Sequence, residues 1–386
     1  MTSAASPAAE ICLANARIVL VDRVVRGAVH VAGGKISAIS EGASIPRGAL
    51  DLGGDVLMPG LVELHTDNLE HHLEPRPKAK MPHLGAILAH DGEMASVGIT
   101  TVYDALRVGS SDTGENRTTR YARQVAREIL ELSAQDALRA RHLIHLRAEI
   151  CSETLIEELS EFGPGDRVGL VSMMDHTPGQ RQFRDLAKFR IYNSAKHGFD
   201  EARFAELVRQ RQELGQKRRA AHKTAILEAA TRLGAPLASH DDTSAAHVAA
   251  SAASGVQLAE FPTTLEAAQA CRDAGIAIMM GAPNLIRGGS HAGNVSAEAL
   301  AREGSLDIMS SDYVPSLLLA SAFRLAALWG DLPRGVATVT AAPARAAGLD
   351  DRGEIAQGRL ADLVRVRDLV GTPVIRAVWR GGERIA

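Results

Sequence analysis

The chain has 386 residues, of which 46% are hydrophobic, 23% are charged and 3% are aromatic, and its formal net charge at pH 7 is −3. That length allows one large globular domain or two modest ones. The balanced charge argues against nucleic acid or a membrane surface as a partner. The scarcity of aromatic residues argues against a stacking surface for single-stranded nucleic acid.

The cysteines and the N-terminal segment indicate a cytoplasmic protein. Cys12, Cys151 and Cys271 are far apart and form no CxxC pair, which fits a reducing compartment. Residues 1–20 lack the basic and apolar regions of a signal peptide. No apolar run reaches the roughly 18 residues that a membrane-spanning helix needs.

Both ends of the chain contain short β-strand patterns. Residues 10–58 include the run GAVHVAGGKISAIS, in which Gly33-Gly34 marks a hairpin turn between two strands. Residues 350–386 include the similar runs ADLVRVRD and TPVIRAVWRGGERI. Each segment is too small to fold alone, so we expect residues 1–58 and 350–386 to pair into one β-sandwich domain. Two separate β appendages are the alternative.

The middle of the chain, residues 59–349, alternates between short apolar runs and helical patterns. Residues 116–140 and 202–233 carry charged and apolar residues at helical spacing. The apolar runs are LVELHTD, ITTVYDAL, HLIHLRAEI, VGLVSMMDH, APLASHDD, VQLAEFPTT, IAIMMGAPN and LDIMSSDYV. This alternation predicts parallel βα units, and eight runs predict an α/β fold of the (β/α)8 TIM-barrel type.

Ionisable residues gather where these runs end, which is where the strands of a (β/α)8 barrel form its active site. They are His65, Asp67, His145, Arg147, Glu149, Asp175, His176, His240, Asp241, Asp242 and Asp312. Each has an ordinary explanation when taken alone; Asp241 or Asp242, for example, is expected to be the N-cap of the next helix. Together they indicate imidazole and carboxylate ligands for one or two divalent ions such as Zn, Mn or Fe.

Longer motifs resemble the amidohydrolase superfamily over nearly the whole chain. DVLMPGLVELHTD, followed by the later histidines and Asp312, resembles its metal-binding strands, and VTAAPARAAGLDDRGEIAQGRLADLVRV resembles the return to its β-domain. The stretches LVELHTDNLEHHLEPRPK, SMMDHTPGQRQF, MGAPNLIRGGSHAGNVSA and LDIMSSDYVPSLLLASAF are similar to the ribosyl 5-triphosphate diphosphatases of the carbon–phosphorus lyase pathway. This resemblance implies a bacterial metal-dependent hydrolase of phosphonate catabolism that releases pyrophosphate and leaves the 5-phosphate.

The resemblance also implies roles for individual residues, with Asp312 as both a metal ligand and the catalytic base. The implied metal ligands are His65, Asp67, Glu149, His176, His240 and Asp312. Two departures from the wider superfamily concern this set. The usual His-x-His motif is His-Thr-Asp at residues 65–67, and no lysine stands where a carboxylated lysine commonly bridges the metals, so Glu149 is the nearest equivalent. Residues 70–72 are expected to lie on a loop beyond the first strand.

A triphosphate is strongly anionic, so a site rich in carboxylates needs further cations. Arginine suits this task because its planar guanidinium group grips phosphate oxygens with two N–H groups. The candidates for substrate binding are Arg76, Arg107, Arg147, Arg181, Arg287 and His291. For each arginine, a solvated charge or a structural ion pair is the alternative. Glu260, after the sixth run, shows no ligand pattern and is expected to pair with a neighbouring arginine.

Two other functions fit part of the pattern. An amidohydrolase acting on a cyclic or N-acyl amide would use the same metals and base but would not need the arginines. A non-catalytic scaffold on the same fold would be expected to have lost ligands, whereas His65, His176, His240 and Asp312 are present. We therefore expect a small phosphorylated molecule as the substrate. Barrels of this superfamily often associate, which leaves room for a homo-oligomer.

Overall fold

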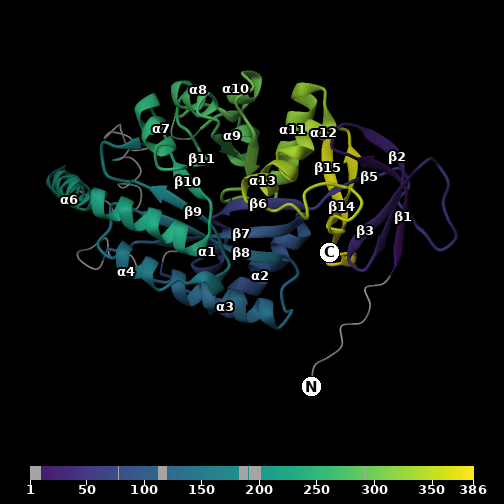
Figure 1. Ribbon diagram of the computed structural model, residues 1–386, viewed down its shortest axis with the longest axis horizontal. Helices are drawn as coiled ribbons and strands as arrows, with labels where there is room; N and C mark the ends of the chain where they lie inside the picture. The colour runs from purple at the N-terminus through teal and green to yellow at the C-terminus, as the bar shows by residue number, and fades with distance from the viewer. Residues whose placement is uncertain (1–9, 77, 112–119, 182–189, 191–200, 291–292) are drawn as a thin grey trace.

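The computed structural model describes residues 10–76, 78–111, 120–181, 190, 201–290 and 293–386. It contains two eight-stranded sheets: a barrel of parallel strands surrounded by helices, and a mixed sheet built from both ends of the chain (Figure 1). The predicted α/β barrel and the predicted pairing of the two chain ends are both confirmed.

The eight barrel strands are the eight apolar runs. They are β6 (Leu61–Thr66), β7 (Ile99–Val108), β8 (Arg141–Glu149), β9 (Val168–Met174), β10 (Leu237–His240), β11 (Leu258–Glu260), β12 (Ala277–Gly281) and β13 (Ile308–Ser310). Each strand lies parallel to the next one in sequence, and a parallel bridge between Thr66 and Asp312 brings the two ends of the sheet together. The strands are buried on both faces, which explains why their sequences are nearly continuous apolar runs.

Helices cover the outside of the barrel. They are α1 (Asn68–Leu73), α2 (His83–Ser96), α3 (Ala122–Ala134), α4 (Leu155–Ser160), α6 (Glu201–Leu233), α7 (Ala245–Ala252), α8 (Leu265–Asp273), α9 (Ala282–Arg287), α10 (Ala297–Arg302), α11 (Leu317–Trp329), α12 (Leu332–Ala337) and α13 (Ala341–Ala346), with a 3-10 turn at Pro164–Asp166. The helical patterns at 116–140 and 202–233 correspond to α3 and α6. None of the helices in the described residues combines the length and apolarity that a membrane crossing requires.

Two local expectations were wrong. Residues 70–72 belong to helix α1 and not to a loop. The N-cap of α7 is Ser244, whose hydroxyl accepts a hydrogen bond from His247 N, and neither Asp241 nor Asp242 caps that helix. The reason is that both carboxylates bond elsewhere: Asp241 to His240, and Asp242 to Arg181.

The mixed sheet runs in the order β16-β15-β14-β5-β1-β2-β3, with β4 beside β1. Its strands are β1 (Ile11–Val19), β2 (Val24–Ala32), β3 (Lys35–Glu41), β4 (Leu50–Asp51), β5 (Val56–Pro59), β14 (Leu363–Leu369), β15 (Thr372–Arg380) and β16 (Glu383–Arg384). Antiparallel pairing of β5 with β14 joins the two chain ends. Gly33 and Gly34 have φ angles of 58° and 77°, as a two-residue hairpin turn between β2 and β3 requires.

One face of the mixed sheet packs into the hydrophobic core around the barrel, and the sheet also has a buried cluster of its own, which includes Leu13, Ile18 and Trp379. Val364, Val366 and Val378 of the mixed sheet belong to the same buried cluster as Ile99 of the barrel and Leu325 of α11. A third cluster, which includes Val62, Leu64, Tyr103, Leu170, Leu258 and Met279, fills the inside of the barrel. The domain boundaries at residues 58/59 and 349/350 stay predictions, and β5 runs across the first of them.

Candidate metal centre

All six predicted metal ligands lie at the carboxyl ends of barrel strands. Each is within two positions of the last residue of β6, β8, β9, β10 or β13: His65, Asp67, Glu149, His176, His240 and Asp312. Because parallel strands end at the same face of a barrel, these side chains all lie on that face.

His65 lies between two carboxylates. Its ring is buried, with Nε2 at 3.6 Å from Oδ1 of Asp67 and Nδ1 at 3.3 Å from Oε1 of Glu260. Its ring centroid is 5.5 Å from that of His240. Burial lowers the pKa of His65, but the charge of Glu260 and the interactions with Asp67 and Glu260 together outweigh this effect and raise the pKa to about 10. The surroundings of this ring therefore favour a positive charge.

Glu149 is held as a carboxylate by His176. One of its oxygens bonds Nδ1 of His176 at 2.6 Å, and the other accepts hydrogen bonds from the backbone N–H groups of Cys151 and His176 at 2.9 and 3.2 Å. Burial raises the pKa of Glu149, but the charge and the hydrogen bonds of His176 lower it to about 2. The carboxylate is thus ionised and fixed in direction.

The imidazole of His240 has one nitrogen bonded and one without a partner. Nδ1 bonds Oδ2 of Asp241 at 2.7 Å, and that oxygen also lies 4.0 Å from Nε2 of His176. Nε2 of His240 is buried and has no hydrogen-bond partner among the described residues. A carboxylate on one ring nitrogen is typical of a metal-binding histidine, because it leaves the lone pair of the other nitrogen available.

Asp312 is a carboxyl group suited to proton transfer. Its backbone carbonyl accepts a hydrogen bond from Asp67 N at 2.9 Å, which places the two residues side by side. Burial and the negative charge of Asp67 raise the pKa of Asp312 to about 6. A group that titrates close to neutral pH can both accept and release a proton.

Unsatisfied polar atoms concentrate at this face of the barrel. Among the described residues, His65 Nδ1, His240 Nε2 and both oxygens of Glu260 are buried without a hydrogen-bond partner. Buried polar groups are otherwise nearly always bonded. Among these atoms, Nε2 of the predicted ligand His240 is a nitrogen donor near buried carboxylates, which is the kind of environment that fits a divalent cation.

A second cluster of histidines lies between α2 and the barrel wall, and its buried polar atoms have hydrogen-bond partners. His90 and His142 each bond one oxygen of Asp104 at 2.8 Å. The other ring nitrogen of His90 bonds Asn68 at 3.2 Å, and that of His142 bonds Asp91 at 3.3 Å. Since all these atoms are satisfied within the protein, we interpret the cluster as a structural network and not as a metal site.

The chain matches a curated protein along nearly all of its length. It is 41% identical over 374 residues to the α-D-ribose 1-methylphosphonate 5-triphosphate diphosphatase of Escherichia coli K12, with 96% of this chain and 99% of that protein covered. The chain belongs to this diphosphatase family. No family model matches the sequence.

Solved structures of amidohydrolases share the fold of this diphosphatase family. The N-isopropylammelide isopropylaminohydrolase of Burkholderia multivorans aligns with a TM-score of 0.64 at 16% identity, covering 97% of each chain. The 5-methylcytosine deaminase of Klebsiella pneumoniae aligns with a TM-score of 0.65 at 15% identity, covering 97% of this chain and 98% of the other. The N-acetyl-D-glucosamine-6-phosphate deacetylase of Mycobacterium smegmatis aligns with a TM-score of 0.62 at 16% identity, covering 98% and 99%. At these identities the likeness concerns the amidohydrolase fold alone.

Three of the arginines predicted to bind the substrate make internal contacts. Arg147 forms a buried ion pair with Asp67, whose charge raises the pKa of Arg147 against the opposing effect of burial. Arg181 donates to the backbone oxygen of His240 at 2.6 Å and to Oδ1 of Asp242 at 2.5 Å. Arg107 donates to the backbone oxygen of Gly109 at 3.0 Å.

The remaining candidates lie on connecting segments. Arg76 and Arg287 are exposed, and within the described part of the chain the side chain of neither makes a hydrogen bond or ion pair. The segment that follows Arg287 reaches the strand-end face, because Val295 N bonds the carbonyl of Thr263 just after β11. His291 lies outside the described residues.

Glu260 is the residue of this site that the sequence did not indicate. Instead of an arginine, it lies against His65 and His145, with its Oε1 3.3 Å from His65 Nδ1 and 3.5 Å from His145 Nε2. Burial raises the pKa of Glu260, but the neighbouring imidazoles of His145 and His65 lower it to about 2. Its place in the sixth apolar run, where the strand stops, was the available signal, because Glu149 and His240 are likewise the last residues of β8 and β10.

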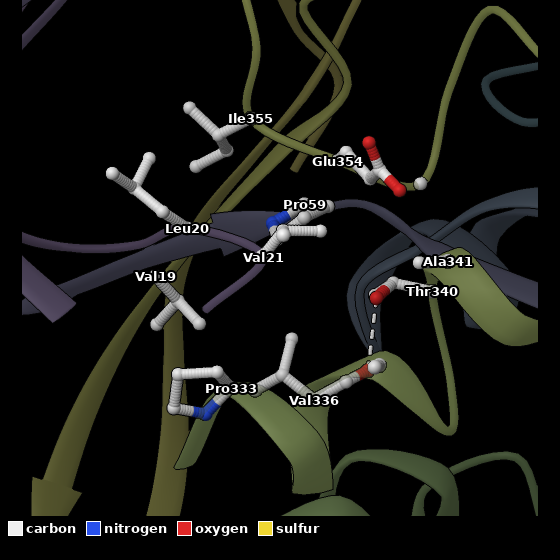
Figure 2. Close-up of a pocket in the computed structure, with 12 residues that line it drawn as sticks. Val19, Leu20, Val21, Pro59, Pro333, Val336, Thr340, Ala341, Glu354 and Ile355 are labelled. Atoms are coloured by element: carbon white, nitrogen blue, oxygen red, sulfur yellow. Dashed lines mark hydrogen bonds between the residues drawn. The ribbon is translucent and has the colours of Figure 1, made fainter. Parts of the chain in front are cut away.

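A small pocket lies far from these residues in the fold. Figure 2 shows Val19, Pro59, Pro333 and Ile355 around it, where the mixed sheet meets α12. Pro59 precedes β6, so the pocket is at the amino-terminal face of the barrel, opposite the metal centre. Its free volume of about 20 Å³ has room for about one water molecule and not for a ribosyl triphosphate.

Proposed function

We propose that the protein hydrolyses α-D-ribose 1-methylphosphonate 5-triphosphate to the 5-phosphate and pyrophosphate, as a step of phosphonate catabolism. The observation that carries this proposal is the 41% identity over 96% of the chain to the Escherichia coli diphosphatase. The strand-end cluster supports it, because it combines metal-type donors with a carboxyl group that titrates near neutral pH.

One or two divalent ions, of Zn, Mn or Fe, would be held by His65, His176 and His240 together with the carboxylates of Asp67, Glu149 and Asp312. Such an ion lowers the pKa of a water molecule and offsets charge on phosphoryl oxygens. The extra carboxylate at Asp67, where other superfamily members have histidine, favours a harder ion such as Mn.

The residues of the chain would then orient the substrate and move one proton. A carboxylate oxygen of Asp312 would accept the proton of the attacking water. Arg76, Arg107, Arg147, Arg181, Arg287 and His291 are the candidates for holding the phosphates. At an effective dielectric constant of about 20, a charge pair at about 4 Å is worth roughly 4 kcal/mol, so even two such contacts would offset much of the repulsion from the carboxylates.

An assay of pyrophosphate release tests the proposal. The purified protein, supplied with Mn²⁺ or Zn²⁺, is incubated with the ribosyl triphosphate, with ATP and with a dihydropyrimidine. We expect pyrophosphate from the first substrate, much less from ATP, and no ring opening of the amide. Release of single phosphates, or cleavage of the amide alone, would contradict the proposal and favour the alternative of a cyclic or N-acyl amide hydrolase.

We also propose a cytoplasmic location. Because barrels of this superfamily often associate, we propose in addition that the protein is a homo-oligomer. Size-exclusion chromatography with light scattering gives the mass in solution directly, and a mass equal to that of one chain would contradict the second proposal.

A further inference from the structure

Two consecutive residues at the end of β11, Glu260 and Phe261, lie directly beneath the proposed ligands. Glu260 is completely buried, and its carboxylate makes no hydrogen bond among the described residues. Phe261 has a φ angle of 56°, which is rare for a bulky side chain. An unsatisfied carboxylate beside a strained residue is costly, and such features persist at functional sites where the surrounding structure enforces them.

His145 determines which neighbour can bond Glu260. Nδ1 of His145 lies 3.0 Å from the backbone carbonyl of Leu64, which can only accept, so this nitrogen carries the hydrogen. Nε2 of His145 is then the acceptor, and the hydroxyl of Ser172 lies 3.0 Å from it. The N–H group that remains for Glu260 is that of His65 Nδ1, at 3.3 Å.

When a metal ion takes the place of the second proton of this ring, a hydrogen on Nδ1 leaves the lone pair of Nε2, on the side of Asp67, for the ion. The distance of 3.6 Å between His65 Nε2 and Asp67 Oδ1 is longer than a hydrogen bond. Each of these neighbouring atoms can therefore offer a lone pair to a metal ion. A carboxylate behind a histidine in this way fixes the tautomer and the orientation of a metal-binding ring.

The ring of Phe261 contacts two of the proposed ligands at once. It meets the ring of His65 at 5.0 Å and 73°, and that of His240 at 5.3 Å and 77°, both edge to face. Backbone hydrogen bonds hold the segment on both sides, from Asp241 N to Glu260 O and from Phe261 N to Met279 O, each of 2.9 Å. The left-handed backbone therefore directs one aromatic ring against both imidazoles.

We propose that Glu260 and Phe261 are positioning residues of the metal centre: the carboxylate fixes the tautomer of His65, and the aromatic ring fixes the planes of His65 and His240. This inference rests on the metal centre of the proposed function and adds to it two residues that do not touch the substrate.

The first experiment compares Glu260→Ala and Glu260→Gln with the parent protein. Zn²⁺ affinity is measured by competition with a chelating indicator, and the tautomer of His65 in the Zn²⁺-loaded protein by side-chain ¹⁵N NMR. We expect roughly 10- to 100-fold weaker binding for Glu260→Ala, with the bound stoichiometry unchanged and the Nδ1–H signal of His65 lost. Glu260→Gln keeps an oxygen that can accept from His65, so it should recover part of the affinity.

A matched control is Glu158→Ala, which removes another buried glutamate, on α4, where Thr154 Oγ1 bonds it. It should lower the stability of the metal-free protein without changing Zn²⁺ affinity. Parent-like affinity and an unchanged His65 tautomer in Glu260→Ala would overturn the inference. So would the loss of a full equivalent of Zn²⁺ in that variant, because Glu260 would then be a ligand itself.

The second experiment separates the ring of Phe261 from its backbone strain. Glycine adopts positive φ without strain, whereas alanine does not, so Phe261→Gly should unfold at a higher temperature than Phe261→Ala. Both lack the ring, so we expect Zn²⁺ binding at least tenfold weaker in both. If the more stable variant, Phe261→Gly, instead bound Zn²⁺ more tightly than Phe261→Ala, affinity would depend on stability and the role of Phe261 would be structural only. Inactivity of the parent on the ribosyl triphosphate would count against the proposed function and leave these affinity comparisons standing.

Discussion

Asp312 adopts a φ angle of 56° just after β13, and Asp241 and Phe261 have the same angle just after β10 and β11. A left-handed residue at a strand end turns the chain sharply, so that the side chain remains at the face where the strands stop. Aspartate tolerates this conformation far better than phenylalanine does, because its short side chain can bond locally. The strain at this face is thus concentrated at Phe261.

Replacement of Asp312 by asparagine tests its role as the base. The amide keeps an oxygen for a metal ion but cannot accept a proton, so kcat for pyrophosphate release should fall by roughly 10²- to 10⁴-fold. Most of the bound metal, measured by elemental analysis of the purified protein, should remain. Full activity in this variant would remove Asp312 from the base assignment.

Arg287 is the clearest candidate for a phosphate contact, since it is exposed and makes no ion pair in the described part of the chain. An exposed ion pair contributes roughly 0.2–1 kcal/mol, so Arg287→Met should raise KM for the ribosyl triphosphate by up to about fivefold with kcat and thermal stability unchanged. Arg47→Met, at an exposed arginine of the mixed-sheet unit, is the matched control and should leave KM unchanged. Equal KM values in the two variants would count against Arg287.

Most of the site residues could be predicted because each ends a recognisable apolar run. Glu260, the first residue of EFPTT, could not, because a single acid there has no partner within the local sequence. Its neighbours His65 and His145 belong to other strands, and only closure of the barrel brings them to it. The same holds for Arg147 and Asp67, whose ion pair joins β8 to the end of β6.

Strand β8 places two histidines in opposite surroundings. His145 points into the barrel, where burial lowers its pKa to about 3. His142 points outward to α2, where burial also lowers its pKa, but the charges and hydrogen bonds of Asp104 and Asp91 together raise it to about 9. The alternation of side chains along a strand explains how residues three positions apart face different neighbours.

The raised pKa of His142 gives a prediction for stability against pH. The pKa in the unfolded chain is about 6.5, so the protonated ring stabilises the fold fully below that pH. This contribution is lost as the pH rises from about 6.5 to about 9. The difference in unfolding free energy between the parent and His142→Asn, measured with urea at pH 6, 7.5 and 9, should therefore shrink at each step. A difference that grew with pH would mean that His142 is neutral in the folded protein.

Helix α1 shows why a short element can escape prediction. A six-residue helix is marginal by itself, and the residues after β6 gave no pattern strong enough to mark one. Its first residue, Asn68, donates to His90 and to Glu93 of α2 at 3.2 and 2.8 Å. Tertiary contacts of this kind stabilise α1. They begin at Asn68, the residue that follows the proposed ligand Asp67.

At the scale of the whole molecule, the packing of β14 and β15 into the core around the barrel predicts that the barrel and the mixed sheet unfold together. The chain has two tryptophans, Trp329 on α11 beside the barrel and Trp379 on β15 in the mixed sheet. The variants Trp329→Phe and Trp379→Phe each leave one fluorescent reporter. Urea titrations of the two should give coincident transitions. Separate midpoints would show that the two units fold independently of each other.

The overall architecture followed from the sequence because alternating strand and helix patterns leave few topologies. The charged contacts that join the two chain ends and the two units did not. Asp55 is buried and pairs with Arg365 and Arg367 within the mixed sheet, and Arg141 of the barrel pairs with Asp362, just before β14. These charges look like ordinary surface residues in the sequence, since nothing local identifies partners some two or three hundred positions away.

The pairing of β5 with β14 also has a consequence for synthesis of the chain. Pro59 and Leu363 are partners across about 300 residues. At roughly 5–20 residues per second, a ribosome needs about 15–60 seconds to travel that distance. During this time β5 has an open edge while the barrel strands emerge one by one. If translation stalls before β14 has been made, the nascent chain carries β5 with an unpaired edge. Such a chain is prone to aggregate through that edge.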